Sequence, residues 1–240
     1  WYCADMASGF RAQREIVQQD WRPPVMRQYD ASEVARLFPD SVRDEQCLIL
    51  LVHEGPASRV DAEVVAVESI MAHLGLKPAD AAAAEGWMGH RNTVPEWRDL
   101  LEQGLIADTI EVSGTWSQID AIYEDVVAAL KTVPDCVNAS AHSSHVYRSG
   151  INLYFTFACM PEDASVMGNR YLESWDQALT ATAKAGGGIA HHHGSGRLRR
   201  DYLHHDLGDN GLALLRKLKQ AIDPQGILNP GNLLPLTDVD

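Results

Sequence analysis

The sequence lacks the glycine-rich motifs that mark common nucleotide-binding and hydrolase folds. It has no GxGxxG run directly after an apolar strand, no Walker phosphate loop and no GxSxG sequence. Gly194-x-Gly196 alone is too short a pattern to indicate a nucleotide site. These absences argue against a chain that binds a dinucleotide through a Rossmann fingerprint, a P-loop NTPase and a serine hydrolase of the elbow type.

Cysteine and basic residues are also scarce. The four cysteines are widely spaced with no CxxC pair, a pattern typical of buried free thiols in a reducing compartment. The 20 lysines and arginines are outnumbered by 33 acidic residues, giving a formal charge of −13. Such a charge disfavours binding to phosphate backbones and anionic lipid, so we expect no nucleic-acid partner.

No apolar run approaches the length of a membrane span, and the first residues do not resemble a signal peptide. We therefore expect a cytoplasmic protein with no transmembrane segment. The chain begins at Trp1 and not at Met, which favours a piece of a longer polypeptide. The sequence leaves a homodimer open.

What is present predicts alternating strands and helices. Helices are expected from Ala7 to Gln18, to Leu37 after a cap at Asp30 or Ser32, from Arg59 to Leu74, from Ser117 to Lys131, from about Pro161 to Ala185 and along Gly211 to Ile222. Strands are expected at Val25 to Tyr29, Cys47 to His53, Ala107 to Val112, Val137 to His145 and Gly150 to Cys159. The alanine-rich piece Ala79 to Glu85 is ambiguous and could form a strand that completes a β-α-β unit.

This order predicts an α+β fold, in which two ferredoxin-like β-α-β units form an antiparallel sheet covered by helices on one side. The end of the chain, AIDPQGILNPGNLLP, is rich in turn-forming residues around short apolar anchors. Such a segment packs as irregular backbone with amides available for binding.

The most informative motif is the histidine run of GGGIAHHHGSGRLRRDYL, formed by His191, His192 and His193. Adjacent imidazoles can hold and move protons near neutral pH and are rarely needed for packing. An affinity-tag remnant is one alternative, but the sequence continues well beyond the run. A metal site could combine these histidines with His142, His145, His204 or His205, yet no standard ligand spacing is present, so we expect no metal.

Three segments, taken in order, resemble a known family. They are WRDL around Arg98, HVYRSGINLYFTF around Tyr154, and the histidine run followed by DPQGILNPGNLLP. Together they resemble the C-terminal part of FAD-linked oxidases of the vanillyl-alcohol oxidase superfamily, and within it the alkyldihydroxyacetonephosphate synthases. HHHGxGxLR is the sharper sign, because the D-lactate and glycolate dehydrogenase branch usually carries Glu-His-Gly there.

The resemblance implies roles for individual residues. Tyr154 matches the catalytic acid/base of the family, and His191, His192 and His193 match the triplet beside the flavin. Arg98 and Arg27 match arginines that the family uses at an anionic, lipid-like substrate, and Asn229 matches a flavin contact of the terminal segment. The residues alone favour a core aromatic for Tyr154 and an exposed helix charge for Arg98, and only the resemblance reverses these interpretations. A phenol has a pKa near 10, so positive neighbours would be needed to favour its phenolate.

The implied reaction is the FAD-dependent exchange of the acyl group of acyl-dihydroxyacetone phosphate for a fatty alcohol, a step of ether lipid synthesis. Residues 1–185 would form the cap that binds substrate, and residues 186–240 a C-terminal segment that completes the flavin domain. The N-terminal FAD-binding half is absent, so we expect the chain alone to be inactive. Two alternatives stay open: an FAD-dependent oxidoreductase of a 2-hydroxy acid or alcohol, and a non-catalytic binding module.

Overall fold

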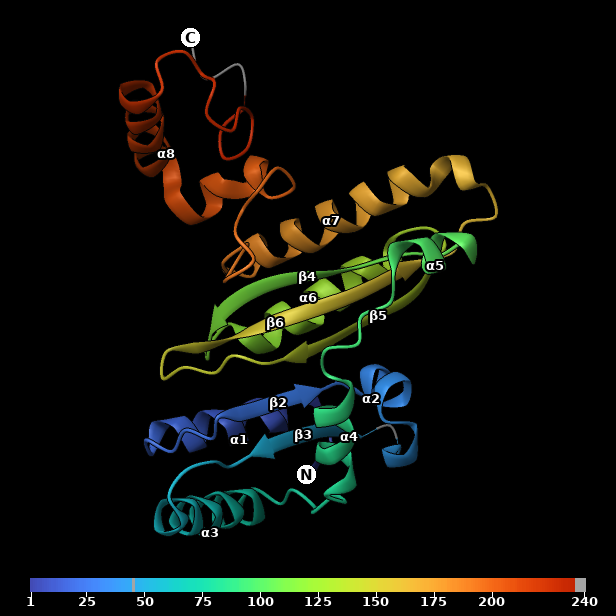
Figure 1. Cartoon of the computed structure of the whole chain (residues 1–240), viewed down its shortest axis with the longest axis vertical. Coiled ribbons are helices and arrows are strands. Elements are labelled where there is room, and N and C mark those ends of the chain that lie inside the picture. Colours follow the sequence, from blue (N-terminus) through green and yellow to red (C-terminus); the bar gives the residue numbers. More distant parts are fainter. Residues whose placement is uncertain (45, 236–240) are drawn as a thin grey trace.

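A computed structural model describes residues 1–44 and 46–235, so the last five residues of the segment 186–240 lie outside it. Within these ranges the chain forms one six-stranded sheet in the order β1-β3-β2-β5-β6-β4, and every neighbouring pair is antiparallel (Figure 1). The strands are β1 (Tyr2–Cys3), β2 (Val25–Tyr29), β3 (Cys47–Val52), β4 (Ile106–Thr115), β5 (Cys136–Ser143) and β6 (Gly150–Cys159). The expected α+β fold with an antiparallel sheet is confirmed.

Most of the described helices lie between these strands in the sequence, and the last two follow β6. They are α1 (Met6–Gln18), α2 (Ala31–Leu37), α3 (Ala57–His73), α4 (Ala82–His90), α5 (Trp97–Glu102), α6 (Ile119–Thr132), α7 (Met167–Lys184) and α8 (Leu203–Ile222), with short 3-10 turns at Pro39–Ser41, Ala164–Val166 and Arg200–Tyr202. None of the helices in the described residues is long and apolar enough to cross a membrane.

The two faces of the sheet are covered differently. Strand residues alternate between the faces, so each strand sends one set of side chains into each layer. The larger core joins α1, α3, α6 and α7 to one face, through side chains such as Ile16, Ile122 and Phe155. A smaller core on the other face places α2 and α4 over β2 and β3, around Tyr29 and Leu48. Helices therefore lie on both faces, and not on one side as the sequence suggested.

The ambiguous segment Ala79 to Glu85 is not a strand. Its four consecutive alanines begin helix α4, because alanine has the highest intrinsic helix propensity and Asp80 accepts the N–H of Ala82 at 2.9 Å. The position beside β3 is taken instead by β1, which the sequence analysis did not recognise. A two-residue strand has too few positions to show an alternating pattern.

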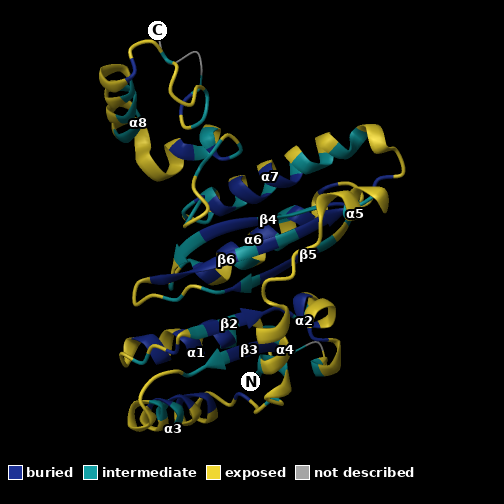
Figure 2. Cartoon of the chain, in the orientation of Figure 1, coloured by how far each residue is buried: buried dark blue, intermediate teal, exposed yellow. Residues whose placement is uncertain are grey.

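The C-terminal part extends away from the sheet. In Figure 1, α8 and the residues after it lie beyond α7, at the end of the molecule opposite β3 and α3, and Figure 2 shows this region mostly exposed. Several of its apolar side chains stay in contact with solvent: Leu207, Leu214, Leu218, Ile222, Ile227, Leu228 and Leu233. These side chains give the C-terminal part an apolar surface in contact with solvent.

The start of α2 predicts an unusual dependence of stability on pH. The buried Asp30 carboxylate accepts hydrogen bonds from the N–H groups of Glu33 and Ala141 and from Tyr123. Burial dominates and raises the pKa of Asp30 to about 6. The folded protein thus holds this proton more tightly than the unfolded chain, and the resulting stabilisation is complete below about pH 4 and lost as the pH rises through 6.

We expect the free energy of unfolding, measured with urea, to fall by about 3 kcal/mol between pH 4 and 7 because of Asp30, at about 1.36 kcal/mol per pKa unit. Asp30→Asn should remove that fall, because an amide does not titrate. Glu33 acts in the opposite direction, because its pKa is lowered to about 2 in the folded protein. Its contribution to the free energy of unfolding is lost only as the pH falls below about 4. Equal slopes for wild type and Asp30→Asn above pH 4 would contradict the assignment.

Candidate active site

A row of polar and aromatic side chains crosses the sheet on the face opposite α6 and α7. The strand register places Tyr29 opposite His142, His142 opposite Tyr154, and Tyr154 opposite Glu111. Residues directly opposite each other in adjacent strands point to the same face, so the row is continuous. The His142 ring stacks on Tyr154 with centroids 4.9 Å apart and on Tyr29 at 5.4 Å.

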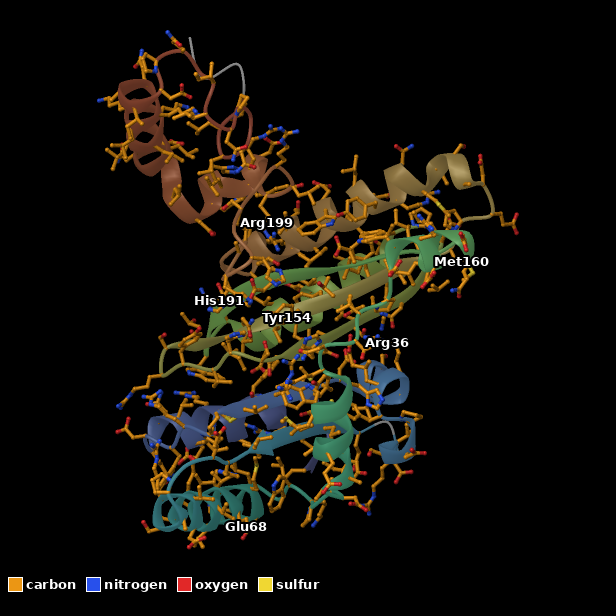
Figure 3. The ribbon with its side chains drawn as sticks, viewed as in Figure 1. Arg36, Glu68, Tyr154, Met160, His191 and Arg199 are labelled. Carbon is orange, nitrogen blue, oxygen red and sulfur yellow. The ribbon has the colours of Figure 1, made fainter. Side chains whose placement is uncertain are left out.

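The histidine run lies at the Glu111 end of this row. Figure 3 shows Tyr154 and His191 near the same end of the sheet, with Arg199 on the following segment. Gly188 pairs its backbone with Ser113 of β4 through two hydrogen bonds of 2.8 and 3.0 Å. A Cβ at Gly187 would lie 2.7 Å from Ile122 Cδ1 and 3.1 Å from the Ser113 carbonyl, so this close approach requires glycine.

Arg199 joins the histidine segment to the core through hydrogen bonds. Its buried guanidinium donates to the carbonyl oxygens of Ile189, Gly194 and Glu111 at 2.9, 3.2 and 3.1 Å. It also lies 4.7 Å from the centre of the Trp175 ring of α7. Five donors in one rigid plane allow a single arginine to hold three separate backbone positions. The LRR sequence after the histidines thus serves to position them.

Glu111 is the centre of the site, and sequence analysis missed it. Its side chain is fully buried, and one carboxylate oxygen accepts the backbone N–H groups of His192 and His193 at 2.9 and 3.0 Å. The other accepts the Asn152 amide at 2.9 Å and lies 3.1 and 2.6 Å from the Nδ1 atoms of His191 and His192. Burial raises the pKa of Glu111, but these hydrogen bonds outweigh it and bring the pKa to about 2.

Two histidines connect this carboxylate to two tyrosine hydroxyls. His192 has its Nε2 3.0 Å from the Tyr154 hydroxyl, and His191 has its Nε2 2.9 Å from the Tyr147 hydroxyl. An imidazole that donates from Nδ1 to a carboxylate has Nε2 free to accept a proton. The hydrogen bond of this kind to Glu111 comes from Nδ1 of His191 at 3.1 Å, whereas Nδ1 of His192 lies 2.6 Å from the same oxygen as an ion-pair contact. Glu111, His192 and Tyr154 thus follow one another in the carboxylate–imidazole–hydroxyl order of hydrolase triads, and we call these three groups the relay.

Tyr154 is protonated near neutral pH in this setting. Burial raises the pKa of its hydroxyl above the ordinary value; Glu111 acts in the same direction, while Arg27 and hydrogen bonds act against it. The positive neighbours expected from the sequence thus do not bring the pKa below its usual range. A neutral hydroxyl can still accept a proton if it passes its own to His192 in the same step.

Among the arginines, Arg27 lies near the row and Arg98 does not. Arg27 is on β2, its Nε donates to the Tyr29 hydroxyl at 2.8 Å, and its charge acts on both His142 and Tyr154. Arg98 is exposed on α5, and no hydrogen bond or ion pair joins it to the row within the part of the chain that the structure describes. A substrate contact by Arg98 stays a prediction.

Asn229 lies in the terminal segment, away from the histidines. It lines a cavity of about 390 Å³ between that segment and α8, together with Leu215, Leu218 and Ile222. Arg200 supports the segment by donating to the Gly231 carbonyl at 2.8 Å. Asn229 adopts a positive φ of 47°, as expected for asparagine in a tight turn. Its contact with a flavin stays a prediction.

Four side chains of the site could also supply metal ligands. Ligand atoms of Glu111, His145, His191 and His192 all lie within 4.8 Å of one another. Carboxylate and imidazole are common zinc ligands, so this cluster is the best metal candidate among the described residues. Nδ1 of His191 already forms hydrogen bonds with Glu111 and with Nδ1 of His192, whereas His145 forms hydrogen bonds with Ser144 and Asn152. The expectation that the site holds no metal stays a prediction.

The fold and this site define a flavin-linked oxidase domain, and comparisons with known proteins agree. The family model for the C-terminal domain of FAD linked oxidases matches residues 1–233, so the chain belongs to that family. An uncharacterized FAD-linked oxidoreductase, YgcU of Escherichia coli, is 32% identical over 97% of the chain and 50% of its own length. FAD is the cofactor of this family, as expected.

Alkyldihydroxyacetonephosphate synthases are among the relatives, as the sequence resemblance indicated. The enzyme of Dictyostelium discoideum is 28% identical over 79% of this chain and 32% of its own length. A solved alkyldihydroxyacetonephosphate synthase shares the fold, with a TM-score of 0.65 at 23% identity over 94% of this chain and 42% of that chain. A 4-ethylphenol oxidase from Gulosibacter chungangensis also shares the fold, with a TM-score of 0.68 at 14% identity over 98% of this chain and 53% of that chain. The chain spans half or less of the curated relatives described here.

The polar row fits a flavin. The helices α6 and α7 pack on the opposite face of β6, which leaves the Tyr154 side partly open, and the His192 side chain is 45% exposed. The exposed edge offers imidazole groups beside a phenol, donors and acceptors of the kind that bind a heteroaromatic ring. Tyr154, His192 and His193 are therefore the residues of this chain that would face the cofactor.

Proposed function

We propose that this chain is the substrate-binding cap and C-terminal segment of an FAD-dependent enzyme that exchanges acyl for alkyl groups, as in the alkyldihydroxyacetonephosphate synthases. The observation that carries the proposal is the Glu111–His192–Tyr154 relay, in which His192 contacts the Glu111 carboxylate at 2.6 Å and forms a hydrogen bond with the Tyr154 hydroxyl at 3.0 Å. The relay can remove a proton from a substrate carbon and return it. The substrate would be an acyl ester of dihydroxyacetone phosphate, with its anionic headgroup bound by arginine.

The residues of this chain would act in a fixed order. Arg27 binds the anionic group and holds the substrate beside the row. The Tyr154 oxygen takes the proton from carbon as its own proton moves to Nε2 of His192, and Glu111 stabilises the imidazolium that results. FAD, when bound, supplies a reversible electron sink beside that carbon. His193 has its ring centroid 5.2 Å from that of Tyr154 and helps to enclose the reacting atoms.

A second candidate is outright oxidation of a 2-hydroxy acid or alcohol. It is favoured by the FAD-linked oxidoreductase relative, which is 32% identical over 97% of the chain. The same relay would then remove the hydroxyl or carbon proton while the cofactor is reduced. Two assays on the polypeptide that also carries the FAD-binding half distinguish the candidates. Fatty-alcohol exchange without dye reduction supports the synthase, whereas dye reduction by hydroxy acids without exchange supports the oxidoreductase.

We further propose that residues 186–240 complete a flavin domain whose larger part lies outside this chain. The exposed apolar side chains of α8 and the terminal segment support this, because they form a surface suited to a second element. The chain alone should then bind FAD weakly, with no yellow complex surviving gel filtration. A tight stoichiometric FAD complex of the isolated chain would refute this division of the protein.

A further inference from the structure

A cavity of about 500 Å³ lies beside the polar row, between β2, the turn at Pro39–Ser41 and helix α4. Arg27, Tyr29 and His142 form its wall on the sheet side, and Trp87 and Gly86 form its wall on α4. The His142 ring also stacks on Tyr154 at 4.9 Å, so the cavity begins one side chain away from the relay. Its volume is in the range typical of small-molecule sites.

Arg27 gives this cavity a positive charge, and no residue of the described ranges forms an ion pair with it. Its guanidinium carbon lies 5.5 Å from the Trp87 ring centre and 5.6 Å from that of Tyr29. Only its Nε has a hydrogen-bond partner among the described residues, so its two terminal nitrogens are available. Asp40 and Asp80 also line the cavity, but neither forms an ion pair with Arg27 within the ranges described, and Asp80 accepts from Ala82.

The cavity wall formed by α4 presents an aromatic ring at one residue and no side chain at the residue before it. The Trp87 indole is flanked by Arg27 and, at 5.7 Å, by Arg91 of the same helix end. Gly86 lines the cavity one residue earlier, and a Cβ built there would meet no atom within 4 Å. Glycine in a helix interior costs about 1 kcal/mol relative to alanine. Packing does not require glycine at position 86. The absence of a side chain there leaves space in the cavity.

We propose that this cavity is the specificity pocket of the enzyme and binds an organic acid. The carboxylate or phosphate of the ligand binds the free guanidinium nitrogens of Arg27, since a planar fork matches both groups with two hydrogen bonds. Its apolar body lies against Trp87, and Gly86 sets how large that body can be. This inference rests on the proposed function and deepens it, because it names Gly86 and Trp87 of α4 as the residues that select the organic part of the acid.

Binding to the isolated chain tests the pocket without any turnover. The probes are phenyl phosphate, phenylacetate and phenol, followed by ligand-observed NMR and calorimetry. We expect at least one of the two acids to bind more than tenfold tighter than phenol. The acid that binds tighter shows whether the pocket prefers a phosphate or a carboxylate. Arg27→Gln should weaken that acid at least tenfold, which is about 1.4 kcal/mol.

Gly86→Leu should weaken the acid at least tenfold by filling the cavity, with Gly86→Ala intermediate. The matched control is Gly89→Leu in the same helix, where a Cβ also meets nothing within 4 Å but does not line the cavity. It should bind like wild type, and thermal unfolding confirms that each variant folds. Unchanged binding by both Gly86 variants, or acid binding no tighter than phenol in wild type, would overturn the proposal.

Failure of the pocket and failure of the proposed function give different results. Tyr154→Phe should leave acid binding within twofold of wild type, because Tyr154 does not line the cavity. If the acids bind as expected but no exchange or dye reduction occurs in the flavin-loaded enzyme, the pocket stands and the proposed function falls. If the flavin-loaded enzyme turns over and neither Gly86→Leu nor Arg27→Gln affects turnover, the proposed function stands and the pocket falls.

Discussion

Tyr154→Phe is expected to lower kcat about 1000-fold in the flavin-loaded enzyme, with KM changed less than threefold. The substitution removes one hydroxyl from the relay and leaves the ring stacked on His142 at 4.9 Å. Positioned general acid–base groups contribute about 100- to 10,000-fold to a rate, and this hydroxyl would carry the whole proton transfer. Steady-state kinetics of fatty-alcohol exchange measure the effect.

Tyr2→Phe is the matched control. Tyr2 lies on β1, and no hydrogen bond of its hydroxyl is found in the described part of the chain. It should keep wild-type kcat and KM. A Tyr154→Phe enzyme with more than a tenth of wild-type kcat would remove Tyr154 from the chemistry and leave it as a packing residue.

The second large effect concerns Glu111. Glu111→Ala should lower the free energy of unfolding by about 3 kcal/mol, because one buried and two partly buried N–H donors lose their acceptor at about 1 kcal/mol each, the low end of the usual cost. The donors affected are the backbone amides of His192 and His193 and the side chain of Asn152. Urea unfolding of the isolated chain measures this loss, and Glu124→Ala on the exposed face of α6 should change it by less than 0.5 kcal/mol, roughly the range for surface substitutions.

The sign of the pH dependence gives a second check on Glu111. Its pKa is depressed to about 2 in the folded chain, from an ordinary value of 4.5. The stabilisation is therefore present above about pH 4.5 and lost as the pH falls toward 2. The stability difference between wild type and Glu111→Ala should shrink over that range. A difference that stays constant, or grows on acidification, would show that Glu111 does not hold its proton-free form through these contacts.

Local patterns were enough to predict most of the fold. Apolar alternation and caps identified the strands from β2 to β6 and most of the helices, since each signal lies within a few residues. The helix α4 was left open because a short alanine-rich run fits a strand or a helix until its packing is known. Helix α4 matters for the proposed specificity pocket, since Gly86 and Trp87 form one wall of the cavity.

The site was predicted in part. The histidine run and Tyr154 stood out as residue types with chemistry, and the structure joins Tyr154 to His192 at 3.0 Å. Glu111 was missed because its partners lie about 80 residues away, and sequence spacing carries no information on such contacts. One signal was available: Glu111 is a single acidic residue between the apolar Ile110 and Val112 in the centre of a strand.

We propose above that Tyr154, supported by His192 and Glu111, moves a proton at a substrate carbon. Loss of deuterium from that carbon to water tests it most directly. The sample is the flavin-loaded enzyme with acyl-dihydroxyacetone phosphate deuterated at the carbon that bears the acyl group, followed by NMR without added alcohol. We expect exchange in wild type, about 1000-fold slower exchange in Tyr154→Phe and strongly slowed exchange in Glu111→Ala. Exchange at the wild-type rate in Tyr154→Phe would contradict this proposal.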